Sequence, residues 1–258
     1  MKISILGSGS SGNSIYIEDE KSSFLVDAGF SCKKIEERMN NLGKNLREID
    51  GILITHEHGD HIKGAGIISR KYDIPIYITK ESFVAGEKKL GKVEEHNIKL
   101  IDGNFTINDD ILVKPFDVMH DAERTLGFRI INADDKKIAI STDIGYINNI
   151  VRENFKDVDI MVIESNYDYN MLMNCKYPWD LKARVKGRNG HLSNDDAAKF
   201  IKEMMNEKLK KVYLAHISQD SNNRELLRHN LEMELEREKI KIEYELAKQD
   251  VETGIFKL

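Results

Sequence analysis

The residues best suited to chemistry are gathered in a short segment that follows an apolar run. Residues 51–54 read Gly-Ile-Leu-Ile, which is typical of a buried strand, and residues 55–61 read Thr-His-Glu-His-Gly-Asp-His. The second segment holds four potential metal ligands within six positions. Imidazoles and carboxylates at this density suit a divalent transition metal and contribute little to a hydrophobic core. The pattern therefore predicts a metal site at the end of a strand.

The spacing of the four ligands divides them into two pairs. In an extended segment residues i and i+2 point the same way, so His56 and His58 are placed to bind one ion together. Asp60 and His61 stand where the chain turns into a helix that we expect to begin near Ile62. They are therefore placed to bind a second ion beside the first.

The elements that would position this cluster follow from the hydrophobic pattern, which alternates short β-like runs with helical segments. Strands are predicted at 1–7, 14–19, 23–27, 51–54, 76–78, 98–101, 111–118, 126–132, 137–142, 158–163, 211–214, 240–244 and 253–257. Helices are predicted at 31–43, 62–71, 80–89, 147–153, 194–206 and 222–237. Two β-rich halves, each with helices, suit an α/β fold of the four-layer αββα sandwich type. Nothing marks a domain boundary, so we expect residues 1–258 to form a single domain.

The composition favours a globular intracellular enzyme. The 258 residues are 40% hydrophobic and 32% charged, which argues against disorder. No apolar run of about 18 residues occurs, and the apolar start of the chain is too short for a signal peptide. Cys32 and Cys175 are too few and too far apart for a disulfide framework, which fits a reducing compartment. We therefore expect a cytoplasmic protein without membrane attachment.

A glycine-rich segment near the start imitates a nucleotide-binding motif. Residues 7–12 match G-x-G-x-x-G, and Asp27 lies about where a ribose-binding acid would be sought. That fingerprint needs a helix at the last glycine, whereas residues 13–18 alternate like a strand. The glycines therefore predict a hairpin turn, whose backbone N–H groups could contact a phosphate if the turn borders the metal site.

A local inversion of charge occurs in the second half of the chain. Residues 182–188 carry four positive charges and no acid, although the formal net charge of the chain is −5. Positive charge beside a metal cleft suits a polyanion, and arginine suits bidentate phosphate contact. The alternative is an ordinary solvated helix face. His191 favours the first interpretation, because it stands in a Gly-flanked loop ahead of a helix capped by Ser193 or Asn194.

The segment 55–61 resembles the H-x-H-x-D-H signature of the metallo-β-lactamase superfamily. This resemblance implies three later ligands, each at the C-terminal end of a β-like run. The chain supplies His120 after 113–119, Asp143 after 138–142 and His216 after 212–215. By this analogy His56, His58 and His120 hold one ion, Asp60, His61 and His216 hold a second, and Asp143 bridges them.

Such a centre predicts hydrolysis without choosing the substrate. Zn²⁺ is the default ion for a His-rich site, and a ligand set without thiolate also accepts Mn²⁺ or Fe²⁺. Two metal ions can hold both the attacking and the leaving oxygen of a displacement, which serves amides, thioesters, lactones and phosphodiesters alike. The substrate must therefore be inferred from residues outside the ligand set.

Two further segments resemble the phosphodiesterase branch of the superfamily, which includes the tRNA 3′-processing endonucleases. Those enzymes carry an H-E-A-T segment and a later H-S-T segment, whose Glu and His cooperate at the scissile phosphate. Here residues 162–166 read Val-Ile-Glu-Ser-Asn, and residues 190–193 read Gly-His-Leu-Ser. Glu164 and His191 are thus the expected pair. Ile163 replaces the first His of H-E-A-T, and the long substrate-clamping arm of the tRNA-processing enzymes is absent, which weakens a tRNA-processing role.

A resemblance to the YycJ (WalJ) family covers nearly the whole chain. The matching segments are 7–13, 26–29, 55–61, 120–122, 141–145, 164–166, 190–194 and 214–218. Arg124 departs from that family, which usually has a Pro shortly after His-Asp-Ala. The resemblance implies a bacterial cytoplasmic exonuclease that degrades double-stranded DNA 5′ to 3′ and is linked to DNA repair.

We therefore expect a dinuclear metal-dependent nuclease. The residues assigned to catalysis are Asp60, Glu164 and His191, and those assigned to substrate binding are Arg184, Lys186, Arg188, His191, Ser193 and Asn194. Three alternatives stay open: a small-molecule hydrolase of the lactonase or glyoxalase type, an RNA-processing nuclease of the same fold, and a non-catalytic scaffold.

Overall fold

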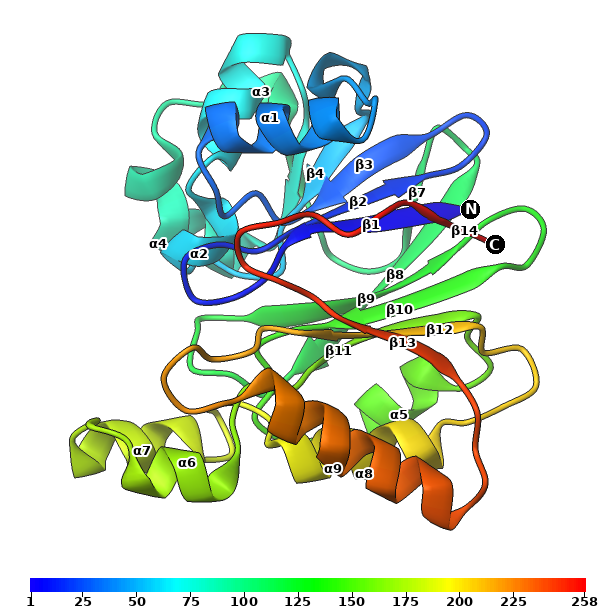
Figure 1. Ribbon diagram of the computed structural model, residues 1–258. Helices are drawn as coiled ribbons and strands as arrows, with labels where there is room; N and C mark the ends of the chain where they lie inside the picture. The colour runs from blue at the N-terminus through cyan, green and yellow to red at the C-terminus, as the bar shows by residue number, and fades with distance from the viewer.

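Apolar strands from the two halves of the chain form two separate sheets, and the computed structural model describes all of residues 1–258 (Figure 1). The first sheet contains β1 (Lys2–Gly7), β2 (Ser14–Glu18), β3 (Ser23–Val26), β4 (Gly51–Leu53), β5 (Ile76–Ile78), β6 (Ile98–Leu100) and β14 (Phe256–Lys257). Its order is β14-β1-β2-β3-β4-β5-β6. β1 to β3 pair antiparallel, and β3 to β6 pair parallel.

The second sheet is built in the same mixed way. It contains β7 (Phe105–Ile107), β8 (Ile111–Val118), β9 (Thr125–Ile131), β10 (Lys137–Ser141), β11 (Ile160–Glu164), β12 (Lys211–Ala215) and β13 (Glu243–Leu246). Its order is β13-β12-β11-β10-β9-β8-β7. β7 to β10 pair antiparallel, and β10 to β13 pair parallel.

Helices cover the outer face of each sheet (Figure 1). On the first sheet these are α1 (Cys32–Asn41), α2 (Gly59–Ile62), α3 (Ala65–Tyr72) and α4 (Lys80–Leu90), with short 3₁₀ turns η1 (Leu46–Glu48) and η2 (Glu95–Asn97). On the second sheet they are α5 (Asn149–Phe155), α8 (Asn194–Glu203) and α9 (Arg224–Arg237). α6 (Tyr169–Asn174) and α7 (Trp179–Val185) project from the side of this helical layer.

The core lies in three apolar layers. The middle layer joins the inner faces of the two sheets, for example Ile5 of β1 and Ile140 of β10. A second layer packs the first sheet against α1, α3 and α4, and a third packs the second sheet against α5, α8 and α9. Each sheet therefore buries both faces, and the predicted αββα sandwich is confirmed.

The parallel strands bring the predicted ligands to one edge of the sandwich. Residues 55–61 follow β4, Asp143 follows β10, Glu164 ends β11 and His216 follows β12. The carboxyl ends of neighbouring parallel strands meet at the same edge of a sheet. Asp143 and His216 leave their strands with φ values of 53° and 51°, in the left-handed region that few non-glycine residues adopt. These sharp turns direct the following loops across the edge.

Several predicted boundaries are wrong. The helix predicted at 62–71 is two helices, because the Gly64 N–H donates to the Ala28 carbonyl at 2.7 Å and not to a helical partner. Only glycine fits this close approach, since a Cβ there would lie 2.3 Å from the carbonyl oxygen of Phe30. The strand predicted at 240–244 begins at Glu243, and the one predicted at 253–257 contains only its last two residues. The short elements β7, α6 and α7 were not predicted. No helix in the structure is both long enough and apolar enough to span a membrane.

Candidate metal centre and its surroundings

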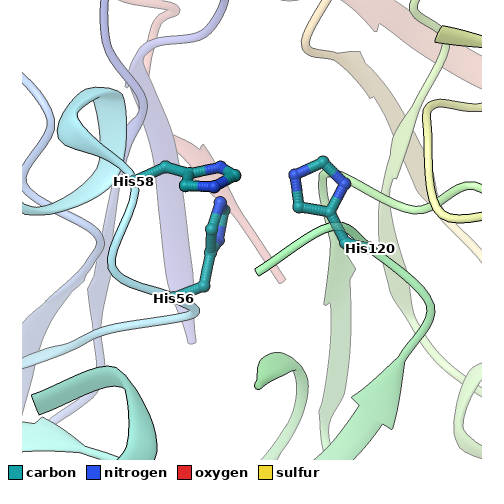
Figure 2. Close-up of side chains that lie close together, drawn as sticks. All are labelled: His56, His58 and His120. Carbon is teal, nitrogen blue, oxygen red and sulfur yellow. The ribbon is translucent and has the colours of Figure 1, made fainter. Parts of the chain in front are cut away.

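Three histidines from opposite sheets face one another at this edge (Figure 2). His56 and His58 follow β4, and His120 follows β8. The ring centroids lie 4.6 Å apart for His56 and His58, 5.1 Å for His56 and His120, and 5.2 Å for His58 and His120. One ring nitrogen of each lies within 4.8 Å of the others. The three imidazoles could therefore hold one divalent ion.

A second group of ligands lies beside the first. Asp60, His61 and His216 bring their side-chain ligand atoms within 4.8 Å of one another. Asp60 and His61 belong to α2, which begins at Gly59 rather than near Ile62 as predicted. His216 approaches from the second sheet, so both halves of the chain contribute to this group.

Asp143 lies between the two groups. Its Oδ2 is 2.9 Å from Nε2 of His61, and its Oδ1 is 3.7 Å from Nε2 of His120. Its carboxylate also reaches His216, whose Nδ1 is 3.5 Å from Oδ1. Asp143 is the predicted carboxylate that contacts histidines of both groups, which is the placement that a bridging carboxylate requires.

The donor atoms of this cluster fit bound cations. Nε2 of His56 and Nε2 of His216 are buried and have no hydrogen-bond partner. Leaving a buried polar atom unpaired costs about 1–3 kcal/mol, so two in one place need compensation. Imidazole nitrogens and carboxylate oxygens without a thiolate suit Zn²⁺, Mn²⁺ or Fe²⁺.

The electrostatics of the cluster also favour a cation. Burial disfavours the charged form of His56 and lowers its pKa well below the ordinary value. Burial opposes protonation of His61 as well, but the carboxylates of Asp27 and Asp143 outweigh it and raise its pKa. Burial is similarly outweighed at His216, where Asp143 and other carboxylates raise the pKa to about 10. Carboxylates that keep the neighbouring imidazoles protonated so strongly will also attract a metal ion.

A buried carboxylate behind the ligands orients two of them. Oδ2 of Asp27 lies 2.7 Å from Nδ1 of His61, which leaves Nε2 directed at the centre. Oδ1 of Asp27 accepts the backbone N–H of Thr55 at 2.8 Å. The Thr55 hydroxyl in turn lies 3.0 Å from Nδ1 of His56. Asp27 and Thr55 therefore fix the imidazole rings that the predicted motif supplies.

Glu164, at the end of β11 in the second sheet, likewise orients two imidazole rings. Its Oε1 lies 2.8 Å from Nδ1 of His191 and 2.7 Å from Nδ1 of His216. Its Oε2 accepts the backbone N–H groups of Ile144 and Leu192 at 2.9 and 3.0 Å. Burial opposes ionisation of Glu164, but His191 outweighs it and holds the pKa below its ordinary value. The structure thus brings together Glu164 and His191, as the sequence predicts.

The end of α7 positions the loop that carries His191. The His191 N–H donates to the carbonyl of Val185, the last residue of α7, at 2.8 Å. The Gly190 carbonyl lies 3.0 Å from Nδ1 of His120. A Cβ on Gly190 would lie 2.2 Å from the carbonyl oxygens of Arg184 and Val185, so only glycine fits there. The loop after α7 therefore supports both a metal-ligand candidate and His191.

The basic segment lies partly beside the centre. Arg184 forms an ion pair with Asp121, the neighbour of His120. Arg184 and Arg188 line a pocket together with Met119 and Asp121. Lys182 is buried, and its Nζ donates to the Met173 carbonyl at 2.8 Å, so its charge serves the fold. Lys186 lies away from this pocket, against the rings of Tyr169 and Trp179.

Two residues assigned to substrate binding are engaged elsewhere. Ser193 is the N-cap of α8, where its hydroxyl accepts the Asp196 N–H. Asn194 is buried, and its side chain bonds Ser165 and Asn222 at 2.8 and 2.9 Å. This geometry does not support the assignment of Asn194 to substrate binding, because an amide enclosed by partners cannot reach a substrate. Ser193 likewise has its hydroxyl committed to the helix.

A known family model matches residues 22–217, with the description Beta-lactamase superfamily domain. The chain is 37% identical over 241 residues to exodeoxyribonuclease YycJ of Bacillus anthracis, covering 92% of this chain and 89% of the relative. It is 40% identical over 228 residues to exodeoxyribonuclease WalJ of Streptococcus pneumoniae, covering 87% and 84%. The chain belongs to the metallo-β-lactamase superfamily. It is an enzyme of that hydrolase superfamily, within the YycJ and WalJ family.

Solved structures agree with the superfamily fold. The metallo-β-lactamase fold protein YhfI of Bacillus subtilis superposes with a TM-score of 0.72 at 16% identity, covering 98% of both chains. The short form of human tRNase Z superposes with a TM-score of 0.67 at 19% identity, covering 98% of this chain and 99% of the other. At such low identity these structures support the αββα fold alone.

Sequence reasoning missed three residues around this superfamily centre. The sequence analysis assigns Asp27 no role at the metal ions, although its carboxylate holds His61. Asn13 follows the glycine-rich turn, and its Nδ2 lies 3.1 Å from Nε2 of His61. The hydroxyl of Ser8 accepts the His216 N–H at 2.8 Å and donates to Asn13 Oδ1 at 2.9 Å. One sequence signal could have indicated Asp27: it is an acidic residue directly after the apolar strand residues 24–26.

Proposed function

We propose that the protein is a dinuclear metal-dependent exonuclease that degrades double-stranded DNA from 5′ to 3′ and serves DNA repair. The observation that carries this proposal is the pairing of His191 with the buried Glu164 beside the metal-ligand set. An imidazole oriented by a buried carboxylate beside the metal ligands suits protonation of the leaving oxygen of a phosphodiester. The names of the YycJ and WalJ relatives support DNA as the substrate.

The proposed ligand assignment follows the two groups described above. His56, His58 and His120 would hold one divalent ion, Asp60, His61 and His216 a second, and Asp143 would bridge them. Two bound ions would supply Lewis acidity and an activated water at neutral pH. Asp60 is the most exposed carboxylate of the set, with its side chain 24% exposed, and we assign it a part in orienting the attacking water.

His191 would serve the leaving oxygen or hold the scissile phosphate. Its Nδ1 is committed to Glu164, so Nε2 is available to donate a proton. Burial disfavours the charged imidazole, but Glu164 outweighs it and raises the pKa of His191, which favours the protonated ring. A protonated imidazole with one nitrogen directed outward is suited to general acid catalysis.

The domain and the location are part of the same proposal. Both sheets supply ligands to one centre, which supports treating residues 1–258 as one domain. Cys32 and Cys175 are both free thiols, which suits the reducing cytoplasm.

The proposal is tested by incubating the purified protein with 5′- or 3′-end-labelled DNA and RNA, single- and double-stranded, with Zn²⁺, Mn²⁺ or Fe²⁺. We expect mononucleotides to be released from the 5′ ends of duplex DNA. Preferential degradation of RNA would favour the activity named for ribonuclease J of Helicobacter pylori, which is 31% identical over 37% of this chain and 15% of that relative. Hydrolysis of thioesters alone would reject the nuclease.

A further inference from the structure

The most exposed aromatic side chains of this protein occur in one region. Tyr146, Tyr169 and Trp179 are 44%, 52% and 66% exposed, and no other Phe, Tyr or Trp is as exposed. Nζ of Lys186 lies 5.9 Å from the ring centroid of Tyr169 and 5.2 Å from that of Trp179. Cζ of Arg188 lies 4.6 Å from the ring centroid of Tyr146. We call Tyr169, Trp179 and Lys186 the aromatic platform.

The platform stands on an ordered support. α6 and α7, which carry it, project from the helical layer (Figure 1). Tyr167, Leu172 and Val185 form a small buried cluster beneath them. The Lys182 ammonium joins α7 to the Met173 carbonyl at the end of α6. The exposed rings are therefore held in place by packing, and are not the frayed tip of a loop.

The platform is connected to the catalytic centre through a few contacts. α7 begins at Trp179 and ends at Val185, whose carbonyl accepts the His191 N–H. Arg184, on the same helix, pairs with Asp121 beside His120. A strand held at His191 would pass Arg184 and Arg188 before it reached the platform.

The charge of this region differs from that of the chain. Residues 169–192 contain five basic residues and one acidic residue, whereas the chain has a formal net charge of −5. Rings alternating with cations complement a strand in which bases alternate with phosphates. The largest of the exposed aromatic rings belongs to Trp179, the only Trp of the chain. A Trp contributes most to the stability of a fold when it is buried, so stability does not explain its position here. Their exposure together marks a binding surface.

We propose that the aromatic platform binds unpaired nucleotides of the DNA strand, with bases stacked on Trp179 and Tyr169 and a phosphate at Lys186. The inference rests on the proposed nuclease function and adds a substrate preference to it. A blunt duplex hides its bases, so the platform would engage the strand only where the end is frayed or single-stranded. Base stacking on aromatic side chains tolerates any sequence, which suits an exonuclease.

The single Trp makes a direct test possible, because fluorescence excited selectively at tryptophan then reports only Trp179. Full-length protein in EDTA, which prevents hydrolysis, is titrated with a 12-nucleotide oligothymidylate and with an abasic oligomer carrying the same number of phosphates. Anisotropy of a labelled copy of each oligomer measures binding independently. We expect oligothymidylate to quench Trp179 in a saturable manner, and the abasic oligomer to bind more weakly without quenching.

Variants separate stacking from charge. Trp179→Ala should weaken oligothymidylate binding by roughly 5- to 100-fold, whereas Trp179→Phe, which keeps a flat ring, should retain most of the affinity. Met233→Ala, which truncates an exposed side chain on α9, is the matched control and should bind like wild type.

Two outcomes would overturn the platform. Saturable anisotropy with unchanged Trp179 fluorescence would place the strand elsewhere, and equal binding of the abasic oligomer would reduce the surface to a charge patch. If either occurs while end-labelled DNA is still degraded, the nuclease assignment stands without the platform. If no oligomer binds and no nucleic acid is degraded, both proposals fall.

Discussion

Oε1 of Glu164 lies 2.8 Å from Nδ1 of His191. The same oxygen is 2.7 Å from Nδ1 of His216, so one buried carboxylate aligns the proposed acid and a proposed metal ligand. His191 is the more exposed of the two histidines, and it is tied to the centre mainly through this contact. Removal of the His191 side chain should therefore leave the metal ligands in place. Removal of the Glu164 side chain should disturb both the proposed acid and metal binding by His216.

His191→Ala is expected to lower turnover on DNA by about 10²–10⁴-fold, the usual contribution of general acid–base catalysis, with metal content unchanged. Single-turnover rates and elemental analysis on the same preparation provide the two measurements. His229→Ala, which removes an exposed His from α9, serves as the control. Wild-type turnover in His191→Ala would remove the main support for a phosphodiesterase.

Asp143→Ala is expected to reduce the bound metal from two ions per chain to less than one. Asp143 contacts His61, His120 and His216, and therefore reaches both groups of ligands. His58→Ala, which removes a ligand of one group only, should leave roughly one ion bound. Elemental analysis after reconstitution with excess metal and dialysis distinguishes these values. A single ion in fully active wild-type protein would show that Asp143 does not bridge.

The motif at residues 55–61 predicted the ligands that are neighbours in the sequence. His56, His58 and His61 are close in sequence, and the turn after β4 is short enough to keep them close in space. Glu164 and His191 lie 27 residues apart, and the resemblance to phosphodiesterases placed them together where spacing alone could not.

Tertiary partners explain what the sequence did not predict. Asp27 holds His61 from a different strand, and no local pattern reveals which acid will face an imidazole 34 residues away. Asn194 lies close to His191 in sequence, but the packing of α8 encloses its side chain. α6 and α7 have six and seven residues, too few for a helical hydrophobic period to stand out.

Glu18 is expected to make stability depend on pH in the acid range. Burial opposes its ionisation, but Lys2, Lys44 and Tyr16 outweigh burial and lower the pKa of Glu18 from 4.5 to about 2. A group whose pKa falls on folding stabilises the native state above its unfolded pKa, and loses this effect as the pH falls toward its folded pKa.

The free energy of unfolding of wild type should therefore exceed that of Glu18→Gln by a constant amount above about pH 5. The difference should shrink between about pH 4.5 and 2. Urea unfolding of metal-free protein at several pH values measures it. A difference that does not change over this range would exclude a charged role for Glu18.

The salt dependence of DNA binding is expected to identify the phosphate contacts of the basic segment. Each neutralised phosphate contributes about 0.9 to the slope of log affinity against log salt, because condensed counterions are released. Lys186→Ala with Arg188→Ala should therefore flatten the slope for duplex DNA with a single-stranded end by about two units. Adding Arg184→Ala should flatten the slope by less than one further phosphate contact would, because the Arg184 guanidinium is already paired with Asp121.

The matched control removes two exposed charges beyond the far end of α9, Lys239→Ala with Lys241→Ala, and should keep the wild-type slope. Affinities are measured by anisotropy in EDTA between 50 and 200 mM salt, the range over which about six to ten phosphate contacts would change affinity by orders of magnitude. Hydrolysis of a small chromogenic phosphodiester, which is too short to reach Lys186, should stay at the wild-type rate in the metal-loaded double variant. An unchanged slope in that variant would make the basic segment an ordinary solvated helix face, and a small-molecule substrate would then explain the site better than DNA.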